Sequence, residues 1–391
     1  MNRKILALMV TAITLAGAGA TQSAVAACDF SQTDLQVGAS GTPIGHARIV
    51  MRPNDRPLLM ISDDVQNTEA LWVYSCANRQ CSSGQATPIE VSTNYFQRSG
   101  IIVRSTGRPA LVGTYFGGLR YYDCGEEDCS QVNVTELIPT QSGILGETPM
   151  ALQANGTAAF IYVDSYSGAR PGQLIYHACA DDACSGGAEK VLAIPPDSSS
   201  QISDLALAID ADGHPAATYL LSHGASNSTD HWIARCNDSA CDNITHTMLA
   251  GTGALFSPSR TDLVIRSDRR PLALDSRNGL QRALLDCDDV SCSSATARPL
   301  PGDDLFGLAL TAGDLPVYGF FSPNWINAWT CTDAACGDGT LDQVGTPNAT
   351  LREADFERGA DGSLYVAYIG PDSSLTFAAC LADSIFADGF D

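Results

Sequence analysis

Lysine is nearly missing from this sequence: Lys4 and Lys190 are the only two among 391 residues. Arginine supplies the other basic side chains, and together the 22 basic residues face 44 acidic ones, for a net charge of −22. Nucleic-acid binding depends on many Lys and Arg contacts with phosphates, and anionic membranes attract basic segments. The charge therefore argues against both as partners.

Long hydrophobic runs are also missing after residue 27, so no transmembrane helix is expected. Residues 1–27 resemble a secretory signal peptide, with Arg3 and Lys4 before an apolar stretch at 5–20 and a small-x-small cleavage site at 24–26. Its removal would leave a mature chain with a net charge of −24, secreted or periplasmic, and its short Ala-rich form is typical of bacteria. The residues before Cys28 loosely resemble a lipobox, so lipoprotein anchoring at Cys28 is a minor alternative.

Cysteine, in contrast, is abundant, and twelve of the 14 cysteines form six C-x4-C pairs. Successive pairs start 44 to 57 residues apart, and Cys380 lies 49 residues beyond Cys331. A period of about fifty residues is typical of solenoids, propellers and other repeat arrays. The pairs are Cys76/Cys81, Cys124/Cys129, Cys179/Cys184, Cys236/Cys241, Cys287/Cys292 and Cys331/Cys336.

Each repeat contains the same order of features. An alternating strand such as 204–210 is followed by a tight turn such as 211–215, in which Gly accepts positive φ. A more apolar strand such as 158–163, a polar loop of variable length and a third strand that ends at the first cysteine come next. After the four link residues and the second cysteine, a fourth strand such as 132–138 completes the unit. Four short antiparallel strands per unit predict a propeller blade.

The seventh unit is incomplete, because the chain ends soon after Cys380 without a second cysteine or a fourth strand. Residues 28–38 resemble 336–345, which follow the last C-x4-C link. We therefore predict an all-β, seven-bladed β-propeller of four-stranded antiparallel blades, closed by the N-terminal strand and a Cys28–Cys380 disulfide. The domains would be a signal peptide at 1–27, the propeller at 28–381 and a short tail at 382–391. Zinc-bound thiolate pairs are disfavoured by the oxidising compartment.

The pattern G-x-P, apolar strand, polar loop, L-x-h-x-x-C-x4-C is similar to that of secreted bacterial repeat proteins with seven-bladed propeller folds, over residues 28–380. Residues 385–391 resemble a short tail ending I-F-x-x-G-F-E on secreted proteobacterial proteins, with Asp391 in place of Glu. The resemblance implies architecture and bacterial secretion. It leaves the function open, because propellers host lectins, sialidases, lyases and docking platforms.

Motifs for specific chemistry are largely missing. The sequence contains no sialidase Asp-box, no G-x-S-x-G or H-E-x-x-H motif and no phosphate-binding glycine loop. Residues 210–213 match only part of a calcium loop, and a hairpin turn explains them better. His223 and His231 flank a polar loop with Asp230, which would suit a metal or an acid/base pair, although we favour ordinary loop residues. No cofactor, no metal site and no catalytic residue are assigned.

Acidic residues gather in the C-x4-C links, where they fill 9 of 24 positions. We interpret them as turn formers that also favour solubility, because Asp and Asn side chains stabilise tight turns. The alternative is a docking rim for a cationic partner or divalent ions.

The loops between strands two and three, and those between blades, share one face of a propeller. They vary in length here, and variable loops on a rigid scaffold commonly carry binding residues. Aromatic side chains among polar ones in these loops suit contact with sugars or peptides. The candidate ligand-binding residues are Asp63, Tyr115, Phe116, Asp164, Tyr166, Arg170, His223, Asp230 and Trp325.

These features predict a secreted, monomeric, non-catalytic binding or adhesion protein that recognises a carbohydrate or a protein through its variable-loop face. The alternatives are a propeller-type glycoside hydrolase or lyase of sialidase-like character, and a purely structural envelope protein. Two carboxylates in a central pocket beside an arginine or tyrosine would favour hydrolysis. A shallow aromatic face without convergent acids would favour binding.

Overall fold

The computed structural model shows 29 β-strands in seven sheets within the residues that it describes. The described residues are 30–37, 44–63, 70–91, 99–115, 118–139, 144–164, 172–224, 228–254, 261–276, 282–302, 304–322, 325–345, 353–370 and 373–382.

Each sheet is one blade, and the blades follow one another along the chain. The first contains β2 (Ile44–Met51), β3 (Pro57–Asp63), β4 (Ala70–Cys76) and β5 (Gly84–Val91). The second contains β6 (Gly100–Val103), β7 (Pro109–Tyr115), β8 (Gly118–Cys124) and β9 (Val132–Ile138). The third contains β10 (Ile144–Leu145), β11 (Met150–Leu152), β12 (Ala158–Asp164), β13 (Gln173–Cys179) and β14 (Gly187–Ala193).

The later blades repeat this order. The fourth contains β15 (Ser200–Ile209), β16 (Pro215–His223), β17 (Ser228–Cys236) and β18 (Ile244–Ala254). The fifth contains β19 (Thr261–Ile265), β20 (Pro271–Asp275), β21 (Ala283–Cys287) and β22 (Ala295–Pro299). The sixth contains β23 (Asp304–Leu310), β24 (Pro316–Ser322), β25 (Trp325–Cys331) and β26 (Gly339–Gly345). The seventh contains β27 (Glu353–Arg358), β28 (Leu364–Ile369), β29 (Leu375–Cys380) and β1 (Ser31–Leu35).

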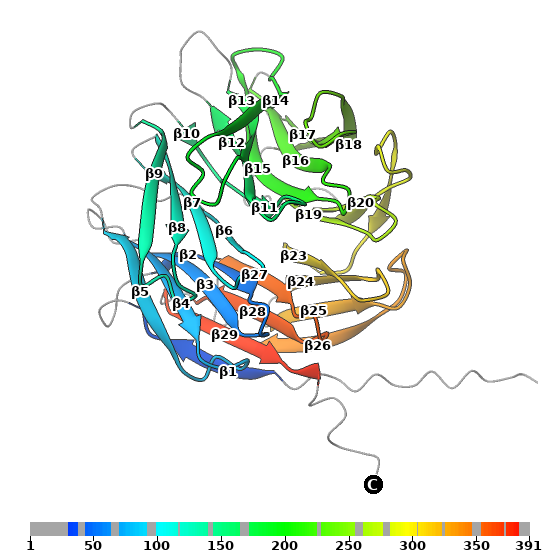
Figure 1. Cartoon of the computed structure of the whole chain (residues 1–391). Coiled ribbons are helices and arrows are strands. Elements are labelled where there is room, and N and C mark those ends of the chain that lie inside the picture. Colours follow the sequence, from blue (N-terminus) through cyan, green and yellow to red (C-terminus); the bar gives the residue numbers. More distant parts are fainter. Residues whose placement is uncertain are drawn as a thin grey trace, which may run out of the picture.

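The blades surround a common centre, and the first strand of each blade lies innermost (Figure 1). Within each blade the strands pair antiparallel in chain order, with two exceptions. In the third blade β10 and β11 both pair with β12. In the seventh, β1 forms the outer edge, where Ser31 pairs with Ala379 and Leu35 with Leu375. The predicted seven-bladed propeller and its closure by the N-terminal strand are therefore confirmed. The inner strand of the third blade is interrupted between β10 and β11, where Gly146 has a φ of 90° and Pro149 offers no N–H.

The hydrophobic core lies between neighbouring blades. Between the first and second blades, Leu58 and Met60 of β3 pack with Leu111 of β7 and Tyr122 of β8, all of them fully buried. The second strand of a blade is buried on both faces, as β28 and β20 show along their whole length. Each blade thus depends on its neighbours to cover its apolar faces, which explains why the unit is repeated until the ring closes.

The C-x4-C segments are tight disulfide-bonded turns at the end of each third strand. All six pairs are bonded, with Cα–Cα distances of 4.8 to 4.9 Å. The second cysteine of every pair has a left-handed backbone, with φ between 49° and 56°, which reverses the chain within the short link. The bonds join Cys76 with Cys81, Cys124 with Cys129, Cys179 with Cys184, Cys236 with Cys241, Cys287 with Cys292, and Cys331 with Cys336.

Acidic link residues hold these turns by accepting backbone hydrogen bonds. In the third blade, the N–H of Cys184 donates to the carbonyl of Asp181, and the N–H of Ser185 donates to the Asp181 carboxylate at 2.9 Å. The second link residue accepts in the same way in other blades, as Asp238 and Asp289 do. These bonds support the turn-forming interpretation of the acidic links.

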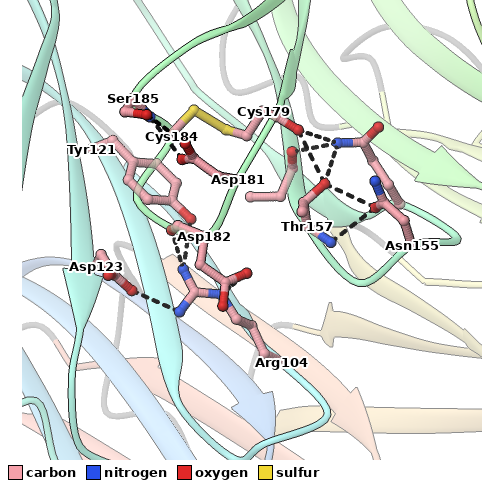
Figure 2. Close-up of polar contacts among 12 residues, drawn as sticks. Arg104, Tyr121, Asp123, Asn155, Thr157, Cys179, Asp181, Asp182, Cys184 and Ser185 are labelled. Atoms are coloured by element: carbon pink, nitrogen blue, oxygen red, sulfur yellow. Dashed lines mark hydrogen bonds and ion pairs between the residues drawn. A yellow bond between two sulfur atoms is a disulfide. The ribbon is translucent and has the colours of Figure 1, made fainter.

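Buried arginines connect several blades to the C-x4-C link of the following blade. Arg104, just after β6, donates to Asp123 at 2.7 Å and to the Tyr121 hydroxyl at 2.9 Å within its own blade. It also donates at 2.6 Å to the carbonyl of Asp182, the third link residue of the following blade (Figure 2). Arg235 and Arg266 make the equivalent contact with the third link residues Val290 and Ala334. We call these three arginines the link-binding arginines.

The seam between the seventh and first blades has its own contacts. Leu35 and Val37 are buried against the first and seventh blades, and Arg79, the third link residue of the first blade, pairs with Asp361 of the seventh. Cys380 is disulfide-bonded, and the twelve link cysteines are paired with one another. Cys28, its predicted partner, lies outside the described residues, as do the predicted signal peptide and residues 383–391.

The disulfides indicate an oxidising compartment, as expected for an extracellular or periplasmic protein. Among the described residues, none belongs to a helix with the length and apolar character needed to cross a bilayer.

Peptide mapping of the oxidised protein by mass spectrometry is expected to recover Cys28 linked to Cys380. Cys380→Ser should free the N-terminal strand, so that limited proteolysis removes it before the blades are cut. The Cys331→Ser/Cys336→Ser variant is the control, because it opens one local turn and leaves the seam intact. A lipid group on Cys28, or equal protection of the N-terminal strand in both variants, would contradict this closure.

Arg104→Met is expected to lower the free energy of unfolding by about 1–3 kcal/mol, because Asp123 and the Asp182 carbonyl lose a charged hydrogen-bond donor. Urea unfolding followed by circular dichroism measures the change. Arg269→Ala is the control: its ion pair with Asp212 is exposed, so the effect should stay within about 0.5 kcal/mol. Equal effects of the two variants would show that the buried contact contributes no more than a surface pair.

Candidate functional site

The loop-face residues singled out from the sequence lie at the ends of strands in different blades. Phe116, Tyr166 and Arg170 lie outside the described residues, and for Asp63 only the backbone is described, at the end of β3. Tyr115 ends β7, Asp164 ends β12 and Trp325 begins β25, where its side chain is 38% exposed. Of the candidates whose side chains are described, the contacts bring one pair together: His223 Nε2 lies 2.9 Å from Asp230 Oδ2.

Neighbouring side chains contact some of these candidate residues and give them a structural role. The guanidinium of Arg120 lies 3.7 Å above the ring of Tyr115 and also pairs with Glu90 of the first blade. His231 is fully buried, with Nδ1 3.8 Å from Asp275 Oδ1 of the fifth blade, so it does not join His223 in one site.

The cysteines that the structure describes do not form a metal site. Within the described ranges, one group of three potential ligands comes together: His177, Cys179 and Cys184. The two sulfurs are bonded to each other and therefore offer no thiolate, although His177 Nε2 lies 3.6 Å from Cys184 Sγ.

The link cysteines of the other blades are structural in the same way. Each is buried and bonded within its own turn, so it has no thiolate for a metal, a nucleophile or a redox step. None of them borders the central cavity described below, which is lined by inner strands. The second cysteines to which this applies are Cys81, Cys129, Cys241, Cys292 and Cys336, and their partners are Cys76, Cys124, Cys236, Cys287 and Cys331.

The strongest concentration of polar groups lies instead in a central cavity of about 570 Å³, lined by the inner strands of all seven blades. Its charged residues are Arg48, Glu147, Asp262, Glu353, Asp355, Glu357 and Arg358. Three of these carboxylates alternate along β27, where successive side chains point to opposite faces. All of β27 borders the cavity, and Glu353, Asp355 and Glu357 alternate there with Ala354 and Phe356, which also belong to the hydrophobic cluster between blades.

Arg48 of β2 is surrounded by carboxylates at the end of the cavity where β27 begins. Its Nη1 lies 3.0 Å from Glu353 Oε1 and 3.8 Å from Asp355 Oδ1, and its Nη2 lies 4.0 Å from Glu147 Oε1. His46 Nδ1 contacts the other oxygen of Glu353. Burial lowers the pKa of Arg48, but the nearby carboxylates outweigh this effect and raise it above its usual value.

Two of the carboxylates also join inner strands of neighbouring blades. The backbone N–H of Ile49 donates to Asp355 at 2.8 Å, and that of Leu308 donates to Asp262 at 2.7 Å. Burial raises the pKa of Asp262 to about 7, with a further contribution from the charge of Asp355, although its backbone hydrogen bonds and Arg48 oppose the shift. Burial likewise raises the pKa of Asp355, which Arg48 and the N–H of Ile49 partly reverse.

Glu357 differs from its neighbours because no side chain among the described residues donates a hydrogen bond to it or pairs with it. Burial raises its pKa to about 8, and the charges of Asp355 and Asp262 add to the shift. At neutral pH this carboxyl is largely protonated. Carboxyl groups with separated protonation states in one cavity are able to perform acid/base chemistry.

The variable loops carry no indication of this cavity, because its lining comes from the inner strands. A signal was nevertheless present: Glu353, Asp355 and Glu357 occupy alternate positions of a first strand, whose exposed face in a propeller can only point to the centre. Arg48, at the equivalent strand of the first blade, gave the same signal.

No protein-family model and no curated protein matches the sequence. Solved structures of propeller proteins are similar to it at low identity. An ulvan lyase of polysaccharide lyase family PL25 has 9% identity over 91% of this chain and 99% of its own, with a TM-score of 0.59. A streptogramin B lyase has 13% identity over 92% and 99%, with a TM-score of 0.58. An α-L-arabinanase from Penicillium chrysogenum has 10% identity over 87% and 93%, with a TM-score of 0.51. At these identities the comparisons show the fold alone.

The raised pKa values of Glu357 and Asp262 predict that the fold loses stability as pH rises. A carboxyl whose pKa is higher in the folded than in the unfolded state contributes its full stabilisation at pH values below its unfolded-state pKa. This contribution is lost as the pH rises through the folded-state pKa, here about 7 to 8. The melting temperature should therefore fall between about pH 5 and pH 9. The melting temperature of the Glu357→Gln variant should fall less steeply with pH than that of the wild type. Glu126→Gln, which changes an exposed link residue, is the control. Parallel curves for wild type and Glu357→Gln would contradict the assignment.

Proposed function

We propose that this secreted propeller is a carbohydrate-binding protein, and that the ligand enters the central cavity. The observation that supports this most is the open polar cavity of about 570 Å³, which is the size of a small-ligand site. Carboxylates and guanidinium groups along its wall offer many acceptors and some donors, and sugar hydroxyls supply both. The loop face, where the cavity's Glu353 end lies, would contribute further contacts.

The charge of the cavity favours a neutral or amino-bearing glycan over an acidic one. Five carboxylates face two arginines, and both arginines already have partners: Arg48 pairs with Glu353, and Arg358 donates to the carbonyl of Leu310 at 3.2 Å. A uronate, sialate or sulfate would therefore meet like charge without a free cation to neutralise it. For this reason we do not favour the sialidase-like alternative.

Trp325 supports a second contact region on the loop face. It is the one aromatic side chain among the exposed large hydrophobic residues of the described ranges. An exposed indole offers a stacking surface for a sugar ring or an anchor for a protein partner. It lies on β25 of the sixth blade and is not among the residues that line the cavity.

A glycan array with the refolded, oxidised protein tests the proposal. Neutral or amino glycans are expected to bind, and sialylated, sulfated and uronate-containing glycans are not. Glu147→Gln, at the cavity end near Arg48, should weaken binding about tenfold by calorimetry, because a charged acceptor is lost. Glu126→Gln, on the opposite face, is the control.

The outcomes separate three interpretations. Loss of binding in Trp325→Ala with unchanged binding in Glu147→Gln would place the ligand on the loop face instead of the cavity. Binding of acidic glycans alone would contradict the charge argument. Binding of no glycan would leave a protein ligand or a structural envelope role.

A further inference from the structure

Two carboxyl groups of β27, Asp355 and Glu357, share the cavity wall but differ in how they are held. Asp355 accepts a hydrogen bond from the N–H of Ile49 at 2.8 Å and faces Arg48 at 3.8 Å, so its position is fixed and a cation stands beside it. Glu357 accepts a hydrogen bond from the backbone N–H of Arg358, but no side chain in the described part of the chain pairs with it, so its carboxyl retains acceptor positions for a molecule in the cavity. The pair therefore combines one fixed and one available carboxyl.

The placement of the pair suits a known arrangement. Residues two apart on a strand point to the same side, and the charge of Asp355 contributes to the raised pKa of Glu357, so the two carboxyl groups stand near each other on the cavity wall. Inverting glycoside hydrolysis uses two carboxyl groups on one site, with room for a water molecule beside the sugar ring.

We propose that the cavity not only binds a neutral glycan but hydrolyses its glycosidic bond, with Glu357 as the proton donor and Asp355 as the base. The proposal rests on the carbohydrate-binding function above. The proton of Glu357 passes to the glycosidic oxygen while the bond between that oxygen and C1 breaks. A water molecule adds to C1 from the opposite face and gives its proton to Asp355. One water is consumed, two sugar products leave, and the proton returns from Asp355 to Glu357 through solvent.

The surrounding residues have consistent roles in this scheme. Burial and the charge of Asp355, with a smaller contribution from Asp262 of β19, raise the pKa of Glu357 to about 8, which keeps the proton on the donor at neutral pH. Arg48 of β2 opposes the rise in the pKa of Asp355, which favours the ionised form that a base requires. Glu353 and Glu147 lie around Arg48 and hold it by ion pairs at the end of the cavity where β27 begins. Arg358 points to the Leu310 carbonyl.

The test uses four soluble neutral polysaccharides, a xylan, a mannan, a mixed-linkage glucan and an arabinan, and counts new reducing ends. The wild type is expected to cleave at least one of them and to release a product of inverted anomeric configuration, observed by proton NMR in the first minutes. Glu357→Gln should lower kcat by about 10²- to 10⁴-fold while KM and array affinity stay close to the wild-type values. Asp355→Asn should also lower kcat, and Glu126→Gln should have no effect.

A second substrate separates a proton donor from a structural residue. A 4-nitrophenyl glycoside of the cleaved sugar has a leaving group that needs no proton. Glu357→Gln should therefore retain far more of the wild-type rate on it than on the polymer, whereas Asp355→Asn should lose both rates alike. A misfolded variant would lose both rates and its cooperative melting transition.

Array binding without cleavage of any of the four polymers would overturn the hydrolysis proposal and leave the binding function standing. Cleavage with retained configuration, or an unchanged rate in Glu357→Gln, would overturn the assignment of the two residues. Neither binding nor cleavage would overturn both proposals.

Discussion

The structure depends on the contact between each blade and the next. A single four-stranded blade has two apolar faces, and β28 and β20 show that its central strand is buried on both sides. Such a sheet has no stable surface of its own until both neighbours are present. The hydrophobic clusters accordingly contain residues of adjacent blades rather than of one. The link-binding arginines add a directional contact to this non-directional burial, because each reaches one specific carbonyl of the following turn.

The disulfide turns gain a second role from these contacts. In three blades the disulfide fixes the short link whose third carbonyl receives an arginine. The second link residue accepts the turn's own N–H groups, as Asp181 does. The acidity of the links is therefore explained to a large extent by local backbone geometry, with positive φ at the second cysteine of every pair. The cavity carboxylates are different in kind, because burial and mutual repulsion raise the pKa values of Asp262 and Glu357, whereas the hydrogen bonds of Asp181 lower its pKa.

Cysteine spacing was sufficient to predict the number of blades and the strand that closes the ring, since both follow from a repeat that can be counted. Cysteine spacing could not reveal the cavity, because Arg48 and Glu353 are 305 positions apart in the sequence. They come into contact only when the ring is closed. Cysteine spacing also missed the interruption between β10 and β11, where Pro149 and Gly146 break an inner strand that the repeat implied was continuous. Sequence periodicity thus indicates the features that are common to all blades, whereas the cavity site is formed by residues that differ from one blade to the next.

The pairing of β1 with β29 has a consequence for how the chain is made. Ser31 donates to the carbonyl of Ala379, a residue 348 positions away, so the first strand to be synthesised has to wait for the last one. During that interval the other blades can fold one after another, because their strands are local in sequence. The central cavity has no complete wall until the final strands join, since β2 and β27 face each other across the seam. A chain truncated near its C-terminus would therefore lack the site even though most of its blades were intact.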